Sequence, residues 1–219
     1  MTRTLLSRSA LLPAAAAVAL VLCGCGPDAA ADSAAPASSP AGSPAAVPSA
    51  ALPTGPFGPG CSAVPASGVG SAADMAVEPV VTAAAHSAVL RSLAAAVERA
   101  DLSESLNSRQ GITVLAPADP AFAAVPGATL TGLLADTAKL TQLLTHHVIE
   151  GRLTPAQLAG THITLNNDTV TVDRTGATFT LSAGQTLGGT RTATVICGDL
   201  QTANATVYVI DQVLTPPAA

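Results

Sequence analysis

The sequence predicts an α+β fold for a single domain over residues 57–219, a range long enough to bury one substantial core. Apolar residues recur at helical spacing in the first part of this range, up to about residue 147. After Pro155 the pattern changes to the alternation of apolar and polar residues that is typical of strands. A helical half followed by a strand-rich half indicates an α+β domain.

Two helices are predicted before residue 101. Pro79 suits the first turn of a helix, because its missing N–H would be unpaired there in any case, and this helix runs to about Ala85. Ser87 is a candidate N-cap for the next helix, which should end near Asp101. One apolar face of that helix is formed by Leu90, Leu93, Ala94 and Val97.

A buried strand and further helices follow. Residues 112–115 read Ile-Thr-Val-Leu between glycine and proline, which predicts a buried strand. Asp119 before Pro120 is a good helix start, because the carboxylate can accept from free amides of the first turn. A short helix is expected over 131–136, followed by a longer one. The apolar face of the longer helix carries Leu140, Leu143, Leu144 and His147.

The remaining chain predicts strands. Apolar residues alternate with polar ones over 163–165 and again over 170–172, and Asn-Asn-Asp at 166–168 supplies a turn between them. These segments therefore form a hairpin. Further strands are predicted over 179–181, 195–196 and 207–210.

The N-terminal segment predicts export and lipidation. Arg3 and Arg8 precede an apolar run over 11–22, and Cys25 follows Leu22-Cys23-Gly24. A basic start, a short apolar core and a small residue before the cleavage site are typical of a secretory signal. Cys25 resembles the lipidated cysteine of the bacterial lipobox, which gives a signal peptide over 1–24. A plain secretory signal or a short membrane anchor remains the alternative.

Residues 25–56 predict a flexible stalk between the lipid and the domain. The segment is mainly Ala, Pro and Ser and lacks the large apolar side chains that could offset the entropy of ordering. Its prolines favour extended polyproline II conformations, and its Ser and Thr residues could carry O-linked sugars. The expected location is the outer face of the cytoplasmic membrane, with shedding possible by cleavage within the stalk.

Charge excludes some classes of partner. Without Arg3 and Arg8 the chain has seven basic and fourteen acidic residues, a formal charge of −7. This balance argues against nucleic acid and against electrostatic attachment to anionic lipid. We therefore expect contact with the membrane through the N-terminal lipid only.

Cysteine usage predicts one disulfide. With Cys23 lost in the signal and Cys25 acylated, Cys61 and Cys197 remain, and two thiols in an exported domain most simply pair with each other. Binding of a metal by two isolated cysteines is the less favoured alternative.

No catalytic motif stands out in the sequence. It contains no Gly-x-Ser-x-Gly elbow, phosphate-binding loop or dinucleotide fingerprint. His147 is expected to point inward and donate to a backbone carbonyl, whereas His146 should be more exposed. Together with Glu150 they lack the i, i+4 histidine pair of zinc helices, and His86 and His162 are expected at the surface. We expect no enzyme activity, no cofactor and no metal.

Three segments resemble conserved motifs of the fasciclin domain. Residues 113–122 (Thr-Val-Leu-Ala-Pro-Ala-Asp-Pro-Ala-Phe) resemble its first box, 144–149 its central Tyr-His segment, and 207–214 its second box. The resemblance covers about 72–216 and is nearest to exported fasciclin antigens and surface lipoproteins of mycobacteria and related actinobacteria. The cysteine segments of that group are similar to 58–61 and 195–198.

The resemblance implies a wedge-shaped sheet flanked by helices and a role in adhesion or surface interaction without catalysis. His146 departs from the pattern, since the family often has Tyr there, and this weakens the transfer of an adhesive role to the pair formed with His147. Asp211 matches a position that is frequent in the second box. Its expected role is to end or pin a strand.

Two functions follow from these expectations. The first is a monomeric adhesion or interaction module whose partner is an extracellular protein, a matrix or an envelope component. The alternative is a binding lipoprotein that holds an apolar or glycolipid ligand between helices and sheet.

Overall fold

The computed structural model describes residues 55–217. The predicted signal peptide over 1–24, the lipidation site at Cys25 and nearly all of the stalk over 25–56 lie outside the described residues. Within 55–217, every helix is too short or too polar to cross a bilayer.

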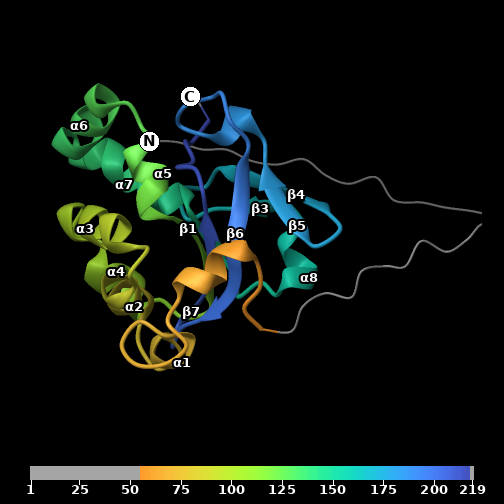
Figure 1. The fold of residues 1–219 in the computed structure, drawn as a ribbon. Coiled ribbons are helices and arrows are strands. Elements are labelled where there is room, and N and C mark those ends of the chain that lie inside the picture. The colour runs from red at the N-terminus through yellow and green to blue at the C-terminus, as the bar shows by residue number, and fades with distance from the viewer. Residues whose placement is uncertain (1–54, 218–219) are drawn as a thin grey trace, which may run out of the picture. The chain divides into compact units, whose positions relative to one another are not determined.

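Helices dominate the first half of the domain and strands the second, as the sequence predicts (Figure 1). The helices are η1 (Pro59–Ala63), α1 (Ala72–Met75), α2 (Val80–His86), α3 (Arg91–Arg99), α4 (Ser103–Ser108), α5 (Asp119–Ala123), α6 (Gly127–Ala135), α7 (Thr137–His146), α8 (Pro155–Leu158) and η2 (Ala183–Gln185). The strands are β1 (Ile112–Pro117), β2 (Val148–Glu150), β3 (Gly160–Ile163), β4 (Thr169–Thr175), β5 (Thr178–Leu181), β6 (Ala193–Gln201) and β7 (Ala205–Ile210).

The seven strands form one sheet that curls until its ends approach each other. Their order is β2-β1-β7-β6-β5-β4-β3, with β1 and β7 parallel and the other neighbours antiparallel. The two outermost strands, β2 and β3, meet at the residues that follow β3. There Ile149 of β2 forms a bridge with Thr164, and the Leu165 amide donates to the Val148 carbonyl at 2.8 Å. Helices α2 to α7 lie on one side of β1, β6 and β7 (Figure 1).

The curled sheet separates two hydrophobic cores. Buried side chains fill the concave interior of the sheet, which is here called the inner core. The second, the helix-side core, lies between the sheet and helices α2 to α7. The inner core includes Leu115, Ile149, Leu158, Val170, Phe179, Leu181, Tyr208 and Ile210.

The first described residues close one end of the inner core. Phe57 pairs with Gly198 of β6 through two backbone hydrogen bonds of 3.1 and 2.8 Å. Its ring lies 5.6 Å from that of Phe179 and 6.4 Å from that of Tyr208. Gly198 is required at this position, because a Cβ there would lie 2.5 Å from the Phe57 ring.

Two predicted helix caps are wrong in detail. The helix predicted to start at Ser87 begins at Arg91, and the Ser87 hydroxyl accepts instead from the Val89 amide. Asp119 does not cap its own helix: its carboxylate accepts from the Ser92 amide at 2.7 Å, in the first turn of α3. Asp119 therefore ties the end of β1 to the neighbouring helix.

Candidate functional site

A disulfide joins Cys61 of η1 to Cys197 of β6, as predicted. The bond spans 136 positions of sequence and connects the start of the domain to the middle strand of the sheet. Two cysteines that are bonded to each other are not available to bind a metal.

His147 points inward, in agreement with the sequence prediction. Its Nδ1 lies 2.8 Å from the Leu143 carbonyl, and its Nε2 accepts from the Leu214 amide at 2.9 Å. Burial lowers its pKa to about 4, although the hydrogen bond to the Leu143 carbonyl opposes the shift. His147 is thus a neutral link between α7 and the end of the chain, and it has no free nitrogen for a ligand.

His146 is buried, so the prediction of a more exposed side chain is wrong. Only 1% of it is accessible, and Nδ1 contacts the Asp168 carboxylate at 2.6 Å. Asp168 also accepts from Thr164 and Asn166. Burial alone would raise the pKa of Asp168, but the hydrogen bonds from Thr164, Asn166 and His146 lower it overall. The cluster joins α7 to the β3–β4 turn, which places His146 in a structural role.

Asp211 pins a strand end. Its carboxylate accepts from the Thr194 amide at 2.7 Å, and its own amide donates to the Thr194 carbonyl at 3.2 Å. The side chain thereby extends the pairing of β7 with β6 beyond Ile210. These contacts are internal to the fold.

Asn204 is buried, although Asn204-Ala205-Thr206 fits the sequence pattern of a glycosylation site. Its Oδ1 accepts from the Val80 amide at 2.8 Å, and its Nδ2 donates to the carbonyls of Leu106 and Arg109 at 2.8 Å each. With 1% exposure, the amide cannot carry a sugar in the folded domain. The side chain thus binds three backbone groups of two helical segments that are distant in sequence, a role that local sequence patterns do not reveal.

The surface around α1 exposes apolar side chains. Val69 and Val77, on either side of this four-residue helix, are 70% and 77% exposed. Gly70 lies so close to the end of α2 that a Cβ there would be 2.5 Å from the His86 carbonyl oxygen, which fixes the loop that carries Val69. We call Val69, Asp74, Val77, Glu78 and His86 the α1 surface.

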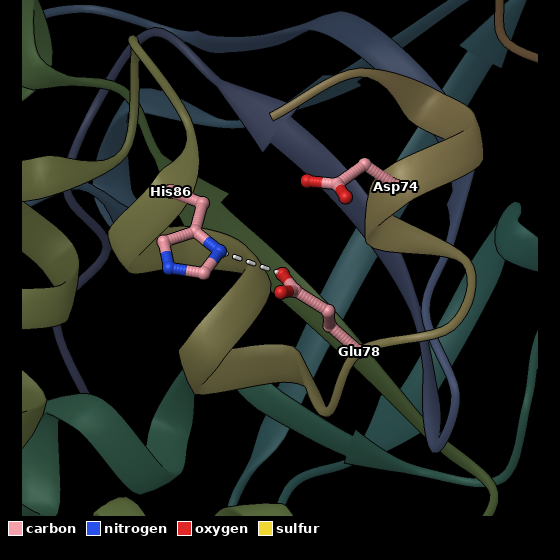
Figure 2. Close-up of side chains that lie close together, drawn as sticks. All are labelled: Asp74, Glu78 and His86. Carbon is pink, nitrogen blue, oxygen red and sulfur yellow. Dashed lines mark hydrogen bonds and ion pairs between the residues drawn. The ribbon is translucent and has the colours of Figure 1, made fainter. Parts of the chain in front are cut away.

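Three potential metal ligands gather on the α1 surface (Figure 2). The ligand atoms of Asp74, Glu78 and His86 all lie within 4.8 Å of one another. Glu78 already pairs with His86 Nδ1 at 2.9 Å, and Asp74 accepts from the Gly70 amide. An exposed ion pair explains the contact without a cation, so we assign no metal here. The sequence did not predict this cluster, because helix α2 separates His86 from Asp74 and Glu78 along the chain.

The helix-side core contains an open cavity. An apolar pocket of about 360 Å³ lies among α3, α5, α6 and α7. A second, more polar hollow of about 90 Å³ adjoins it, since Val125, Leu187 and Val213 line both. The apolar pocket is lined by Ala95, Phe122, Leu133, Leu140 and Leu143, and the polar hollow by Thr190, Arg191 and Gln212.

The predicted site residues within 55–217 all have roles inside the fold. The two predicted histidines are used in internal hydrogen bonds, and the predicted Asp211 pins a strand. The structure does not bring the three residues together into one site. The α1 surface and the apolar pocket are both accessible to solvent.

Comparison with known proteins supports the fold. The fasciclin domain family model matches residues 88–216. The chain is 40% identical over 169 residues to the immunogenic protein MPB70 of Mycobacterium bovis, which covers 74% of this chain and 82% of that protein. It is equally identical, over the same length, to the cell surface glycolipoprotein MPB83 of the same species, of which it covers 72%.

More distant similarities extend beyond mycobacteria. Protein sll1483 of Synechocystis is 35% identical over 151 residues, which is 68% of this chain and 79% of that protein. A solved pair of FAS1 domains from the insect cell adhesion molecule fasciclin I matches with a TM-score of 0.46 and 26% identity, over 59% of this chain and 46% of that structure. The family match spans more than half of the chain, and it includes the buried histidines, Asp211 and Cys197. The chain belongs to the fasciclin domain family.

Proposed function

We propose that this protein is a lipid-anchored surface module that works by binding an extracellular protein, matrix or envelope component, without catalysis. The observation that carries the proposal is the 40% identity over 169 residues to cell surface glycolipoproteins of Mycobacterium bovis and Mycobacterium tuberculosis. The names of these relatives describe surface proteins and antigens.

Anchoring through Cys25 fits this proposal. The N-terminal pattern of basic residues, apolar run and Leu-Cys-Gly-Cys resembles a bacterial lipobox, and Cys25 stands directly before the Ala/Pro/Ser-rich stalk. A stalk of some thirty residues could extend several tens of ångströms at about 3.1 Å per residue. The domain would then stand on the outer face of the membrane with its surface free to meet a partner.

The α1 surface is the contact region that we favour. Val69 and Val77 are two of the three large apolar residues exposed in the described part of the chain, and they flank the same helix. Interfaces combine an apolar centre with polar groups at the rim, which Asp74, Glu78 and His86 could supply. The third exposed residue, Ile163, lies on β3 at the edge of the sheet and offers a matched control.

Photo-crosslinking on intact cells tests the contact surface. A photoreactive residue replaces Val77 in one full-length variant and Ile163 in another, and adducts are identified by mass spectrometry. We expect a discrete adduct at position 77 that position 163 does not give. The same adducts from both positions, or none from position 77, would contradict the proposed surface.

Metabolic labelling tests the anchor separately. The full chain should incorporate labelled palmitate and stay with the membrane, whereas Cys25→Ser should lose the label and move to the culture fluid. Cys23→Ser serves as the control and should behave as the wild type. Label retained in Cys25→Ser would contradict lipidation at this residue.

A further inference from the structure

The helix-side core leaves space that its own side chains do not fill. α6 has no buried residue: Leu130, Leu133 and Leu134 are only half-buried over the apolar pocket. The opposite wall, on α3, presents the small side chains of Ala95 and Ala96. A void of about 360 Å³ is within the usual size range of ligand sites, and it forgoes the dispersion contacts that an occupant would supply.

The two hollows differ in polarity, and this difference indicates the kind of molecule that would fit both. The larger one is lined almost wholly by aliphatic side chains and Phe122, and the smaller one carries Arg191, Gln212 and Thr190. Because the hollows share Val125, Leu187 and Val213, one molecule could fill both. An apolar chain with a compact polar head has this shape.

Charge specifies the head. Among the described residues that line the two hollows there are two arginines and no acidic side chain, in a chain with more acidic than basic residues. Within residues 55–217 the guanidinium of Arg191 has no hydrogen bond or carboxylate partner. Its backbone is held in place, since its carbonyl accepts from the Thr186 hydroxyl at 3.1 Å. A guanidinium donates best to a carboxylate or phosphate.

Arg99 has a different role in the same region. Its Nε donates to the Leu134 carbonyl at 2.7 Å and thereby holds α6 against α3. The leucines of α6 are thus kept over the pocket by a contact at its rim. This makes Arg99 a positioning residue for the wall of the pocket.

We propose that the apolar pocket binds the alkyl chain of a single-chain amphiphile and that Arg191 binds its anionic head group. The site is independent of the anchor at Cys25 and of the α1 surface. It gives the alternative of an apolar ligand a specific location and a ligand class, long-chain carboxylates.

Binding of dodecanoate tests the proposal. The full chain with Cys25→Ser is used, so that no detergent competes, and binding is followed by calorimetry with dodecanol as the neutral probe. Dodecanoate should bind more tightly than dodecanol. Ala95→Phe, which fills the pocket from an exposed position on α3, should abolish binding of both, and Ala156→Phe on α8 should leave it unchanged.

The head-group assignment has its own variant pair. Arg191→Gln should weaken dodecanoate about tenfold, the loss expected for one charge-assisted hydrogen bond, without changing dodecanol. Arg109→Gln removes the same charge from an exposed position outside both hollows and should have no effect. Equal binding of the two probes, or an unchanged affinity in Arg191→Gln, would overturn the assignment to Arg191.

Methyl chemical shifts locate the ligand even if Ala95→Phe fails to fold. Dodecanoate should shift the methyl signals of Leu133 and Val213 and leave those of Leu158, in the inner core, in place. Absence of binding to the wild type, or shifts confined to other residues, would overturn the pocket as the site. These results leave the crosslinking test of the α1 surface unaffected, so the two proposals can fail separately.

Discussion

The inner core and the helix-side core of the same domain are filled in different ways. Rings of Phe57, Phe179 and Tyr208 pack against one another inside the curled sheet, with centroids 5.6 and 6.4 Å apart. The helix-side core contains a single aromatic residue, Phe122, among aliphatic side chains that include many alanines.

This contrast explains where the open cavity lies. Aromatic rings fill much volume per residue, so three of them close the interior of the sheet. Alanine on α3 and α5 allows close approach of backbones but leaves gaps wherever helices diverge, and there a pocket of about 360 Å³ remains. A chain with only four aromatic residues has placed three of them in one core.

The disulfide lies in the helix-side core, where Cys197 is buried and Cys61 packs against it, and its loss should have the largest effect. Replacement of Cys61 and Cys197 by serine should lower the free energy of unfolding by up to about 4–5 kcal/mol, the chain-entropy value for a loop of this length. Urea titration of the double variant measures the loss. A loss below about 1 kcal/mol would show that the disulfide contributes little to the stability of the domain.

Truncation of an aromatic ring should cost more in the inner core. Phe179→Ala should lower the free energy of unfolding by about 3–5 kcal/mol, because the side chain is fully buried and its neighbours cannot collapse into the gap. Phe122→Ala should cost less, since one side of its ring already faces the pocket. Equal losses in denaturant titrations would contradict the contrast between the cores.

Acid should weaken the domain through His147. In the folded state its pKa is lowered to about 4, whereas the unfolded chain has the ordinary value of 6.5. The unfolded state therefore takes up a proton first, and the stability falls between pH 6.5 and 4 by about 3 kcal/mol. Asp168, whose pKa is lowered from 3.8, loses its contribution only at lower pH.

His147→Asn tests this assignment by removing the titrating group. Free energies of unfolding at pH 7 and pH 4.5 should differ less in His147→Asn than in the wild type. The variant His86→Asn, at an exposed position, should retain the wild-type difference. A wild-type pH dependence in His147→Asn would rule out His147 as its source.

The smallest effect is expected at the wall of the pocket. Leu133→Ala on α6 should lower the free energy of unfolding by only about 1 kcal/mol, because the side chain is half-buried above an existing void. Leu158→Ala, at a fully buried position of the inner core, should cost about 2–5 kcal/mol. Thermal unfolding of both variants measures the two losses. An equal or larger loss in Leu133→Ala would contradict the looser packing of the helix-side core.

Much of the fold could be predicted from local patterns. The helical face of Leu93, Ala94 and Val97 and the strand at 112–115 follow from periodicity over a few residues. The hairpin around the turn at 166–168 was also predicted, but its first strand, Gly160–Ile163, ends where the predicted range of 163–165 begins. The sequence did not reveal β2, because three residues directly after α7 are too few to show an alternation. α8 was missed for the same reason, since it has only four residues.

Roles that depend on distant partners could not be predicted. Helical position placed His147 correctly on the apolar face, but the exposure of His146 depends on Asp168, which lies 22 residues away. Asp119 was read as a cap for the following helix, and only the packing of α3 against α5 brings the Ser92 amide to it. The apolar pocket and the cluster at Asp74 likewise arise from elements that are separate in sequence.

The attachment of η1 to β6 has a mechanical consequence. Tension transmitted along the chain that precedes Phe57 would first strain the two backbone hydrogen bonds to Gly198. It would then reach Cys61, where a covalent bond passes the load into the fourth of seven strands. Force applied to the domain from this end therefore acts on the central strand of the sheet, and an outer strand would not be the first to detach.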